Sequence, residues 1–334
     1  MSDGPHPEPR RPFDRYTPMP DQIDISRVPQ PARAVPTSAV LVVNARSRKG
    51  KAAFDEAVQK LTAAGVQLSA THAVRDPARM RSTVQAAVRS GTPMVIVGGG
   101  DGSLSGVVDD LVGHDCVFAV LPLGTANSFA RSLRLPLDLD GAIAAIASGQ
   151  RRRIDLGMIG DDYFVNAASL GLAPLVAETV PHDLKRYLGR VGYLAWALRC
   201  FVRFQPFRLI VDDGEQVHRL WASEVRIFNG RFHGGVELVD STDVDSGDIV
   251  IQAVTGRSRW RLSWDWYAKF FKLRSRNETT VEFRGKRLRL DTRPHLKVSI
   301  DGELLARTPV DVRIAARAIE VMVPRIPATG VAAP

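Results

Sequence analysis

Residues 95–103 read VIVGGGDGS, an apolar run that leads directly into glycines surrounding a single aspartate. The apolar half predicts a buried strand, and the residues that follow, Leu104 to Leu111, predict a helix. Because glycine has no Cβ, the backbone N–H groups of such a turn can approach an anion, and the helix N-terminus adds partial positive charge. The stretch therefore indicates one of two things: a phosphate-binding turn that carries the carboxylate of Asp101, or a tight strand–helix turn that Asp101 caps.

From Ser38 to about residue 150, strand-like and helix-like patterns alternate. This alternation with short links predicts a parallel sheet wrapped by helices, in which ligands bind beyond the carboxyl ends of the strands. Polar turns at Asn44, Gly98 and Leu123 each follow a strand, so we expect them to meet at that edge. The expected strands are residues 39–43, 66–72, 93–97 and 116–120.

After about Arg153, short strand-like runs follow one another with turn residues between them. This spacing predicts an antiparallel β domain that is interrupted by helical stretches near Leu184 to Val202 and near Arg257 to Arg276. The first 36 residues hold nine of the 21 prolines, which is typical of a disordered leader. We therefore divide the chain into residues 1–36, 37–152 and 153–325. The expected strands of the last part are 155–159, 163–168, 208–211, 221–228, 249–254, 280–283, 288–290 and 296–300.

Composition limits the kind of protein. The 334 residues suffice for two domains, and a net charge of +9 favours anionic partners such as nucleic acid, acidic phospholipid or polyphosphate. Only Cys116 and Cys200 are present, both in apolar stretches, so we expect two buried free thiols in a reducing compartment. No apolar run reaches the roughly 18 residues that span a bilayer, and the leader lacks the apolar core of a signal peptide.

Three further turns carry polar groups. Residues 44–51 (NARSRKGK) and 122–131 (PLGTANSFAR) place hydroxyl, amide and basic side chains next to glycine, which suits phosphate contacts. Residues 299–303 (SIDGE) put carboxylates at a strand end or a hairpin corner. Neither the first turn nor the glycine turn has the spacing of a Walker A loop or of the G-x-G-x-x-G dinucleotide fingerprint. A P-loop ATPase and a Rossmann dehydrogenase are therefore disfavoured.

Together these segments resemble the diacylglycerol kinase catalytic family, bacterial lipid kinases related to sphingosine and ceramide kinases. The family's G-G-D-G-[ST] appears at residues 99–103, its P-L-G-T-x-N at 122–127 and its D-G-E at 301–303. The resemblance covers roughly residues 39–324. It implies an α/β N-terminal domain with a doubly wound parallel sheet, followed by a C-terminal antiparallel β-sandwich, with the active site in the cleft between them.

The resemblance also implies ATP with Mg²⁺ as the phosphoryl donor and a lipid hydroxyl as the acceptor. Glu303 matches the family's general base, and Asp101 is expected to organise magnesium and phosphate. Asp245 stands where relatives have a ligand of a structural magnesium ion. The expected nucleotide contacts are Asn44, Ser47, Lys49 (with Lys51 as its alternative), Gly99, Gly100, Gly102, Ser103, Gly124, Thr125 and Asn127.

Three positions depart from the family pattern. Gly106 replaces an acidic residue, Ser128 replaces an aspartate, and Ser246 replaces a second magnesium ligand, for which Asp243 or Asp248 is a substitute. These departures keep open a nucleotide-gated lipid-binding protein with weak or no catalysis. An NAD kinase shares the glycine turn and is a second alternative. A nucleic-acid binder is disfavoured, because no binding module is recognisable and the charge is modest for the length.

Residues 256–276 predict a helix whose aromatic side chains fall on one stripe, with basic residues towards the other side. Such a helix suits an anionic membrane interface, and the alternative is a core-packed helix with a solvated basic face. We thus expect a cytoplasmic lipid kinase associated peripherally with the inner face of the membrane. Diacylglycerol, a sphingoid base, ceramide and phosphatidylglycerol are the candidate acceptors, and a homodimer is one alternative for its assembly. The stripe consists of Trp260, Trp264, Tyr267 and Phe271.

Overall fold

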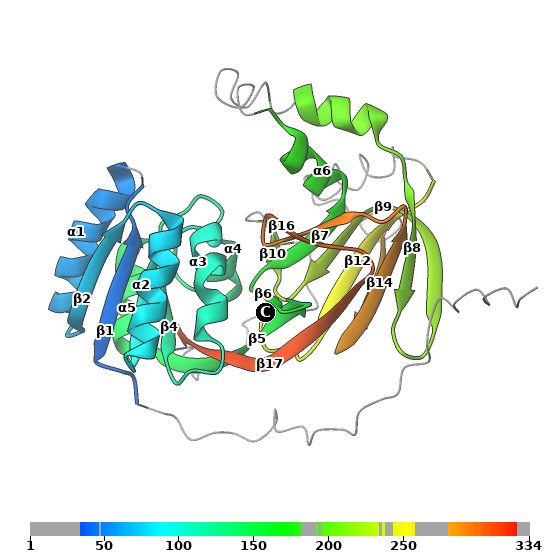
Figure 1. Cartoon of the computed structure of the whole chain (residues 1–334). Coiled ribbons are helices and arrows are strands. Elements are labelled where there is room, and N and C mark those ends of the chain that lie inside the picture. Colours follow the sequence, from blue (N-terminus) through cyan, green and yellow to red (C-terminus); the bar gives the residue numbers. More distant parts are fainter. Residues whose placement is uncertain are drawn as a thin grey trace, which may run out of the picture.

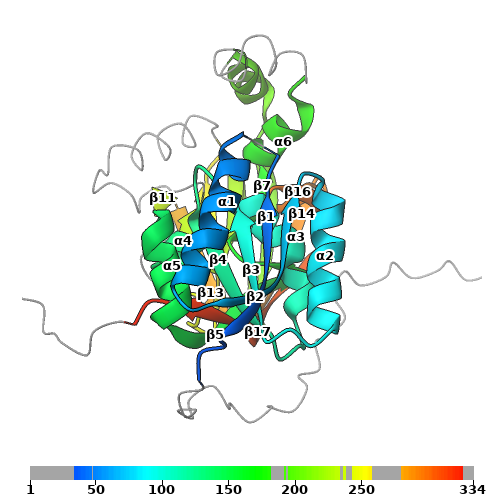
Figure 2. The same ribbon diagram turned by 90° about the vertical axis from the view of Figure 1, so that its left-hand side faces the viewer.

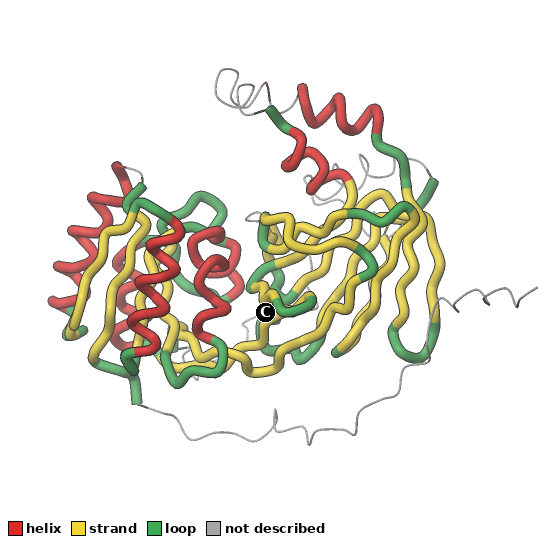
Figure 3. The backbone as a smooth tube through the Cα atoms, in the orientation of Figure 1, coloured by secondary structure: helices red, strands yellow, loops and turns green. Residues whose placement is uncertain are grey.

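The computed structural model describes residues 34–46, 48–181, 192, 195–233, 236–237, 243–257 and 280–325. Within them, an α/β domain and a β domain stand side by side, and the last strand runs from one into the other (Figure 1). The helices gather in the first domain, whereas the second consists mainly of strands (Figure 3). The fold class expected from the sequence is thus confirmed.

Strands β1, β2, β3 and β4 form the parallel sheet of the α/β domain, in the order β2-β1-β3-β4. Helices α1 and α5 cover one face and α2 and α3 the other (Figure 2). The elements are β1 (Ser38–Asn44), α1 (Arg48–Ala63), β2 (Gln67–Val74), α2 (Pro77–Arg89), β3 (Met94–Gly99), α3 (Asp101–Val108), a 3-10 turn (Asp109–Leu111), β4 (Val117–Pro122), α4 (Ser128–Ser132) and α5 (Leu139–Ser148).

The central strands are apolar on both sides because both sides are covered. Along β3, Val95 and Val97 pack towards α2 and α3, while Met94 and Ile96 pack towards α1 and α5. The strands therefore read as continuous apolar runs, which is why the sequence located each of them correctly. Helix α2 begins at Pro77, a residue suited to the first helical position, and the Asp76 carboxylate accepts the Ala78 N–H at 3.0 Å as its cap.

The β domain has two layers of strands around a second apolar core. One layer contains β12, β13, β7, β15 and β16, the other contains β8, β14 and β17, and β9 bends to pair in both. The elements are β5 (Gln150–Ile159), β6 (Asp162–Phe164), β7 (Ala167–Gly171), α6 (Leu172–Thr179), β8 (Phe207–Asp212), β9 (Val217–Phe228), β10 (Phe232–His233), β11 (Val236–Glu237), β12 (Ile249–Thr255), β13 (Thr280–Gly285), β14 (Arg287–Arg293), β15 (Lys297–Ile300), β16 (Glu303–Arg307) and β17 (Val310–Val323).

Strand β17 joins the two domains. Its first residues pair with β14 in the β domain, while Glu320 and Val321 pair in parallel with Val117 and Phe118 of β4. Strand β5 follows β17 along both parts. Strand β17 thus extends the parallel sheet, and its backbone ladder with β5, which shifts register between Ala315 and Ile319, connects the two domains.

The strand expected at residues 163–168 is instead two strands, β6 and β7. The backbone N–H groups of Val165 and Asn166, at the break, donate to the side chain of Asp301 and not to a neighbouring strand. Strand β17 and helices α5 and α6 were missed by the sequence reading. The alanines of residues 315–318 interrupt the alternation in β17, where the ladder shifts register and Arg317 has φ 52°.

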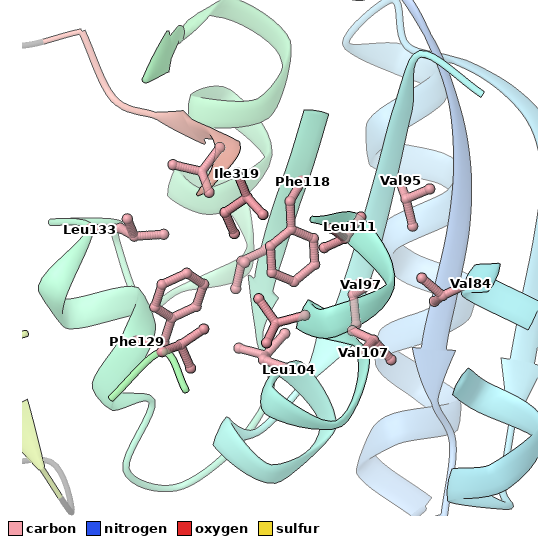
Figure 4. Packing of buried hydrophobic residues seen from close by; sticks show 14 of the residues in the cluster. Val84, Val95, Val97, Leu104, Val107, Leu111, Phe118, Phe129, Leu133 and Ile319 are labelled. Carbon is pink, nitrogen blue, oxygen red and sulfur yellow. The ribbon is translucent and has the colours of Figure 1, made fainter. Parts of the chain in front are cut away.

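The largest apolar cluster fills the space between the parallel sheet, α3 and α4. Phe118 and Phe129 stack there with ring centroids 6.2 Å apart, surrounded by Leu104, Val107 and Leu111 (Figure 4). Helix α4, which begins one residue before Phe129, is therefore anchored to the sheet by its second residue.

Both cysteines are free and buried, as the sequence predicts. Burial raises the pKa of the Cys116 thiol to about 11, so this thiol is protonated and unreactive at neutral pH. None of the helices in the described part of the chain has the length and apolar character that a membrane crossing requires.

The stacked pair provides a test of the core. Replacing Phe129 by alanine should lower the free energy of unfolding by about 3–5 kcal/mol, because a fully buried ring is removed from a packed cluster. Leu198→Ala, at a side chain 62% exposed, is the matched control and should change it by about 0.5 kcal/mol or less. Urea unfolding measures both. An equal loss of unfolding free energy in the two variants would contradict the packing of Phe129 in this cluster.

Candidate active site

The glycine turn connects β3 to α3, as the sequence predicts. Gly100 is the N-cap residue of α3, and Asp101 is the first residue of the helix. Asp101 does not cap its own helix: its Oδ1 accepts the N–H of Phe129 at 3.0 Å, at the start of α4. The carboxylate therefore links the turn after β3 to the turn after β4.

The two turns also touch through their backbones. The Leu123 N–H donates to the Gly99 carbonyl at 3.0 Å. A Cβ on Gly124 would lie 2.5 Å from the Cα of Gly100, and one on Gly100 would lie 3.1 Å from the Cα of Gly124. Since backbone atoms cannot give way as a flexible side chain can, this approach requires glycine at both positions. Gly102 differs, because a Cβ there would meet nothing within 4 Å.

Asn44, at the end of β1, connects the third turn to the same place. Its Nδ2 donates to Ser103 Oγ at 2.8 Å, and its Oδ1 accepts the Arg46 N–H at 3.1 Å. A Cβ on Gly50 would lie 2.4 Å from the Asn44 carbonyl oxygen, so α1 also approaches this turn closely. The expectation that the three turns meet at one sheet edge is therefore confirmed.

Asn127 shapes the turn after β4 from within. It is 5% exposed, has φ 49°, and its Oδ1 accepts the Gly124 N–H at 2.9 Å while its Nδ2 donates to the Gly124 carbonyl at 3.0 Å. Both polar atoms of the Asn127 side chain therefore hydrogen-bond within their own turn. Thr125 lies exposed on the same turn.

A cleft of about 560 Å³ opens in front of the glycine turn. Gly100, Asp101, Gly102 and Ser103 line one side of it, and Glu303 of the β domain also lines it. A neighbouring cavity of about 250 Å³ shares two lining residues with the cleft, Asn44 and Gly100. The lining of the cleft is completed by Asn44, Pro77, Ala78, Met80, Arg81, Gly106 and Val107.

Glu303 owes its position to a two-residue hairpin. Strands β15 and β16 pair Ile300 with Glu303, and the two residues between them, Asp301 and Gly302, have φ 45° and 100°. Positive φ at both central positions is the signature of a type I′ turn, for which Asp-Gly is a favoured sequence. Glu303 is the first residue after this turn, exposed on the border of the cleft.

Asp301 fixes the hairpin to the rest of the molecule. Its Oδ2 accepts the Ser105 hydroxyl of α3 at 2.7 Å and the Val165 N–H at 2.9 Å. Its Oδ1 accepts the N–H groups of Asn166 at 3.1 Å and Ala167 at 3.0 Å. Burial raises the pKa of this carboxyl, and the four donors oppose that shift.

The structure thus brings together most of the residues predicted from the sequence. Asp101, Gly102, Ser103 and Glu303 border one cleft, and the remaining glycines and Asn44 border it or support its turns. Ser47 and the side chain of Lys49 lie outside the described residues, as do residues 258–279 with the predicted aromatic stripe.

Asp245 lies elsewhere and has a cationic partner. Its Oδ2 is 2.5 Å from Nη2 of Arg152 in β5, and Asp243 Oδ2 is 3.3 Å from Arg134 Nη2. Within the described residues no three Asp, Glu, His or Cys side chains come together as a metal ion would need. Guanidinium groups therefore neutralise these carboxylates, and the described residues around Asp245 do not fit a divalent ion.

Two features of the site escaped the sequence reading. The D-G-E motif contained Asp301, but a hairpin alone explained it, and only its contact with Ser105, 196 positions away, shows its role. Arg81 in α2 lines the cleft as well. A single arginine on an amphipathic helix looks like any solvent-facing residue, so no signal in the sequence marked it.

The comparisons with known proteins agree with this architecture. Residues 38–159 match the model of the diacylglycerol kinase catalytic domain, and residues 166–323 match that of the YegS C-terminal NAD kinase beta sandwich-like domain. The chain belongs to the diacylglycerol kinase catalytic-domain family. It is an enzyme of the lipid kinase type by that membership.

Two curated relatives show how far the similarity extends. A protein of Salmonella typhimurium named "Probable lipid kinase YegS" is 31% identical over 228 residues, which cover 66% of this chain and 75% of that protein. A "Probable lipid kinase YegS-like" protein of Chromohalobacter salexigens is 34% identical over 168 residues, covering 48% of this chain. The chain spans about half of the latter's length, 53%.

A solved structure has the same fold. The crystal structure of a diacylglycerol kinase from Bacillus anthracis superposes with a TM-score of 0.71 over 86% of this chain and 97% of its own, at 21% sequence identity. At this identity the similarity supports the fold alone.

The close approach of the two glycine turns can be tested by a matched pair of variants. Gly124→Ala should lower the free energy of unfolding by about 1–3 kcal/mol, because the new methyl group meets the Gly100 backbone. Gly102→Ala should leave it unchanged within about 1 kcal/mol, since that side is open. Thermal or urea unfolding measures both. Full tolerance of alanine at position 124 would show that the turns are not held in contact.

Asp301 offers a second test. Asp301→Asn should lower the free energy of unfolding by about 2 kcal/mol or more. The NH₂ group of asparagine would face N–H or O–H donors at a place where a carboxylate oxygen accepts their hydrogen bonds. Asp311→Asn, which removes an exposed charged partner of Arg287, is the control and should lower the free energy of unfolding by less than about 1 kcal/mol. Urea unfolding compares the two. A loss no larger at position 301 than at position 311 would refute the anchoring role.

Proposed function

We propose that the protein transfers the γ-phosphoryl group of Mg-ATP to the hydroxyl group of diacylglycerol or a similar long-chain lipid. The observation that carries the proposal is that one cleft is lined by the glycine turn of the α/β domain and by Glu303 of the β domain. Family membership supports phosphoryl transfer, and the cleft supplies the groups that this reaction needs.

The nucleotide site is proposed at the three turns. Phosphates bind where backbone N–H groups and a helix N-terminus converge, and α3 begins at Asp101 directly behind Gly99 and Gly100. Gly102 leaves the helix start open, since nothing lies within 4 Å of the position of a Cβ. Asn44 and Ser103, which hydrogen-bond each other, supply polar side chains at the same edge.

Asp101 is proposed to receive the magnesium ion that arrives with ATP. Its Oδ1 is held by the Phe129 N–H, and no described residue donates to Oδ2. Mg²⁺ bound to a nucleotide commonly takes one or two carboxylates and otherwise phosphate and water oxygens. One oriented carboxylate at the phosphate turn therefore fits this substrate-borne ion.

Glu303 is proposed as the general base. It would take the proton of the lipid hydroxyl while that oxygen attacks the γ-phosphorus, and the bond from phosphorus to the bridging oxygen of ADP breaks. The Asp301 anchor holds the hairpin, so the carboxylate of Glu303 is presented by a fixed turn and not by a loose loop.

The same proposal assigns a role to each part of the chain. Residues 37–152 would bind the nucleotide and residues 153–325 the lipid, with residues 1–36 as a leader. Contact with an anionic membrane stays a prediction, because the helix that suggested it lies outside the described residues.

Two substitutions test the reaction. Glu303→Gln should lower turnover by about 10²-fold or more, since the amide cannot accept the proton. Asp101→Asn should also remove most turnover, yet the amide oxygen can still accept the Phe129 N–H, so the protein should fold. The measurement is transfer of labelled phosphate from ATP to diacylglycerol, a sphingoid base, ceramide and phosphatidylglycerol in mixed micelles.

Asp140→Asn, in an exposed ion pair with Lys60, is the control variant and should transfer phosphate normally. Near-normal turnover of Glu303→Gln would refute its role as base. ATP binding by the wild-type protein without transfer to any lipid would favour the nucleotide-gated lipid-binding alternative.

A further inference from the structure

A second, smaller cavity adjoins the cleft, and Glu303 lines both. It has a volume of about 140 Å³, and four of its lining residues also line the cleft: Arg81, Gly102, Gly106 and Glu303. Two of the four are glycines, so the junction between the cavities presents only two side chains among the described residues. These are a carboxylate, Glu303, and a guanidinium, Arg81.

Neighbouring carboxylates hold the Arg81 guanidinium in place. Nε lies 3.1 Å from Asp110 Oδ2 and Nη2 lies 3.4 Å from Asp110 Oδ1, while Asp109 Oδ2 is 3.8 Å from Nη2. Asp110 in turn accepts a hydrogen bond from Gln85 Nε2 at 2.8 Å. Nε and Nη2, the two nitrogens that contact these carboxylates, lie on one edge of the guanidinium. Nη1 donates to no described residue and remains available to a ligand.

The charge of the cleft makes this cation significant. Among the described side chains that line the 560 Å³ cleft, Arg81 alone is positively charged, and Asp101 and Glu303 are both acidic. A triphosphate placed there would face two carboxylates. The phosphoryl group that moves carries negative charge spread over its three equatorial oxygens, and enzymes of this kind stabilise that charge with a metal ion and a basic side chain.

We infer that Arg81 binds the γ-phosphoryl group of the nucleotide through Nη1 and neutralises its charge as it passes from ADP to the acceptor. This inference rests on the proposed phosphoryl transfer and adds the residue that distinguishes ATP from ADP. Arg81 and Glu303 then have complementary tasks at the junction: the first binds the group that moves, and the second takes the proton from the group that receives it.

Gly106 supports the assignment from the opposite side. It lines both cavities, and a Cβ there would meet nothing within 4 Å, so this part of α3 leaves open space beside Arg81. An acidic side chain at position 106 would place a further carboxylate in that space and compete with phosphate for the guanidinium. With glycine at position 106, α3 adds no further carboxylate at that position to those of Asp109 and Asp110 beside Arg81.

The experiment compares the affinities of the full-length protein for ATP and ADP by calorimetry, without any lipid. Arg81→Gln should raise the Kd for ATP by about tenfold or more, the size expected for one charge-assisted contact, and the Kd for ADP by less than about threefold. Arg79→Gln is the matched control: it lies two residues away on the same helix, is exposed and lines neither cavity, so both affinities should stay unchanged.

Two further variants keep the test decisive if Arg81→Gln fails to fold. Arg81→Lys retains the charge and should fall between wild type and Arg81→Gln for ATP. Gly106→Glu should weaken the binding of ATP more than that of ADP. Losses that are equal for ATP and ADP, or absent, in these variants would overturn the assignment. If the wild-type protein discriminates ATP from ADP through Arg81 but phosphorylates no lipid, the proposed lipid acceptor fails and the role of Arg81 stands.

Discussion

The carboxylate of Asp301 is the interaction on which the geometry of the site depends. Four donors from two segments meet on its two oxygens: the Ser105 hydroxyl of α3, and the backbone N–H groups of residues 165–167, between the end of β6 and the first residue of β7. A buried carboxylate is costly unless such donors satisfy it, so the arrangement tolerates little displacement. Because Asp301 also sits in the β15–β16 turn, it fixes the distance between α3 and Glu303.

The opposite wall of the cleft is held by backbone contact. The glycine turns after β3 and β4 approach so closely that a single methyl group at Gly124 would collide with Gly100. Asp101 adds a hydrogen bond between the same two turns, and β17 pairs with the first residues of β4, at the other end of that strand. Hydrogen bonds and close backbone packing therefore define both walls of the cleft. Such fixed positions suit phosphoryl transfer, in which positioning and charge neutralisation supply most of the catalysis.

Features with a local cause could be predicted from the sequence. The buried strands of the parallel sheet, the glycine turn and the Asp-Gly hairpin all depend on neighbouring residues, and each was found where its pattern indicated. Features that depend on contacts with residues far away in the sequence could not be predicted. Strand β17 continues past the alanines at its middle, Ala315, Ala316 and Ala318, which do not favour a strand, because β5 pairs with it on both sides of them and β4 pairs with Glu320 and Val321. Likewise, the contact of Asp245 with Arg152, 93 positions away, could not be predicted from the sequence.

The central claim is that the two walls hold an ATP phosphate chain between the glycine turn and the hairpin. The most direct measurement is a crystal structure with magnesium and a non-hydrolysable ATP analogue. The account predicts the triphosphate on the N–H groups of residues 99–103, with the terminal phosphate at the junction beside Arg81 and Glu303. A triphosphate bound elsewhere, or one with its terminal phosphate turned away from Glu303, would contradict it.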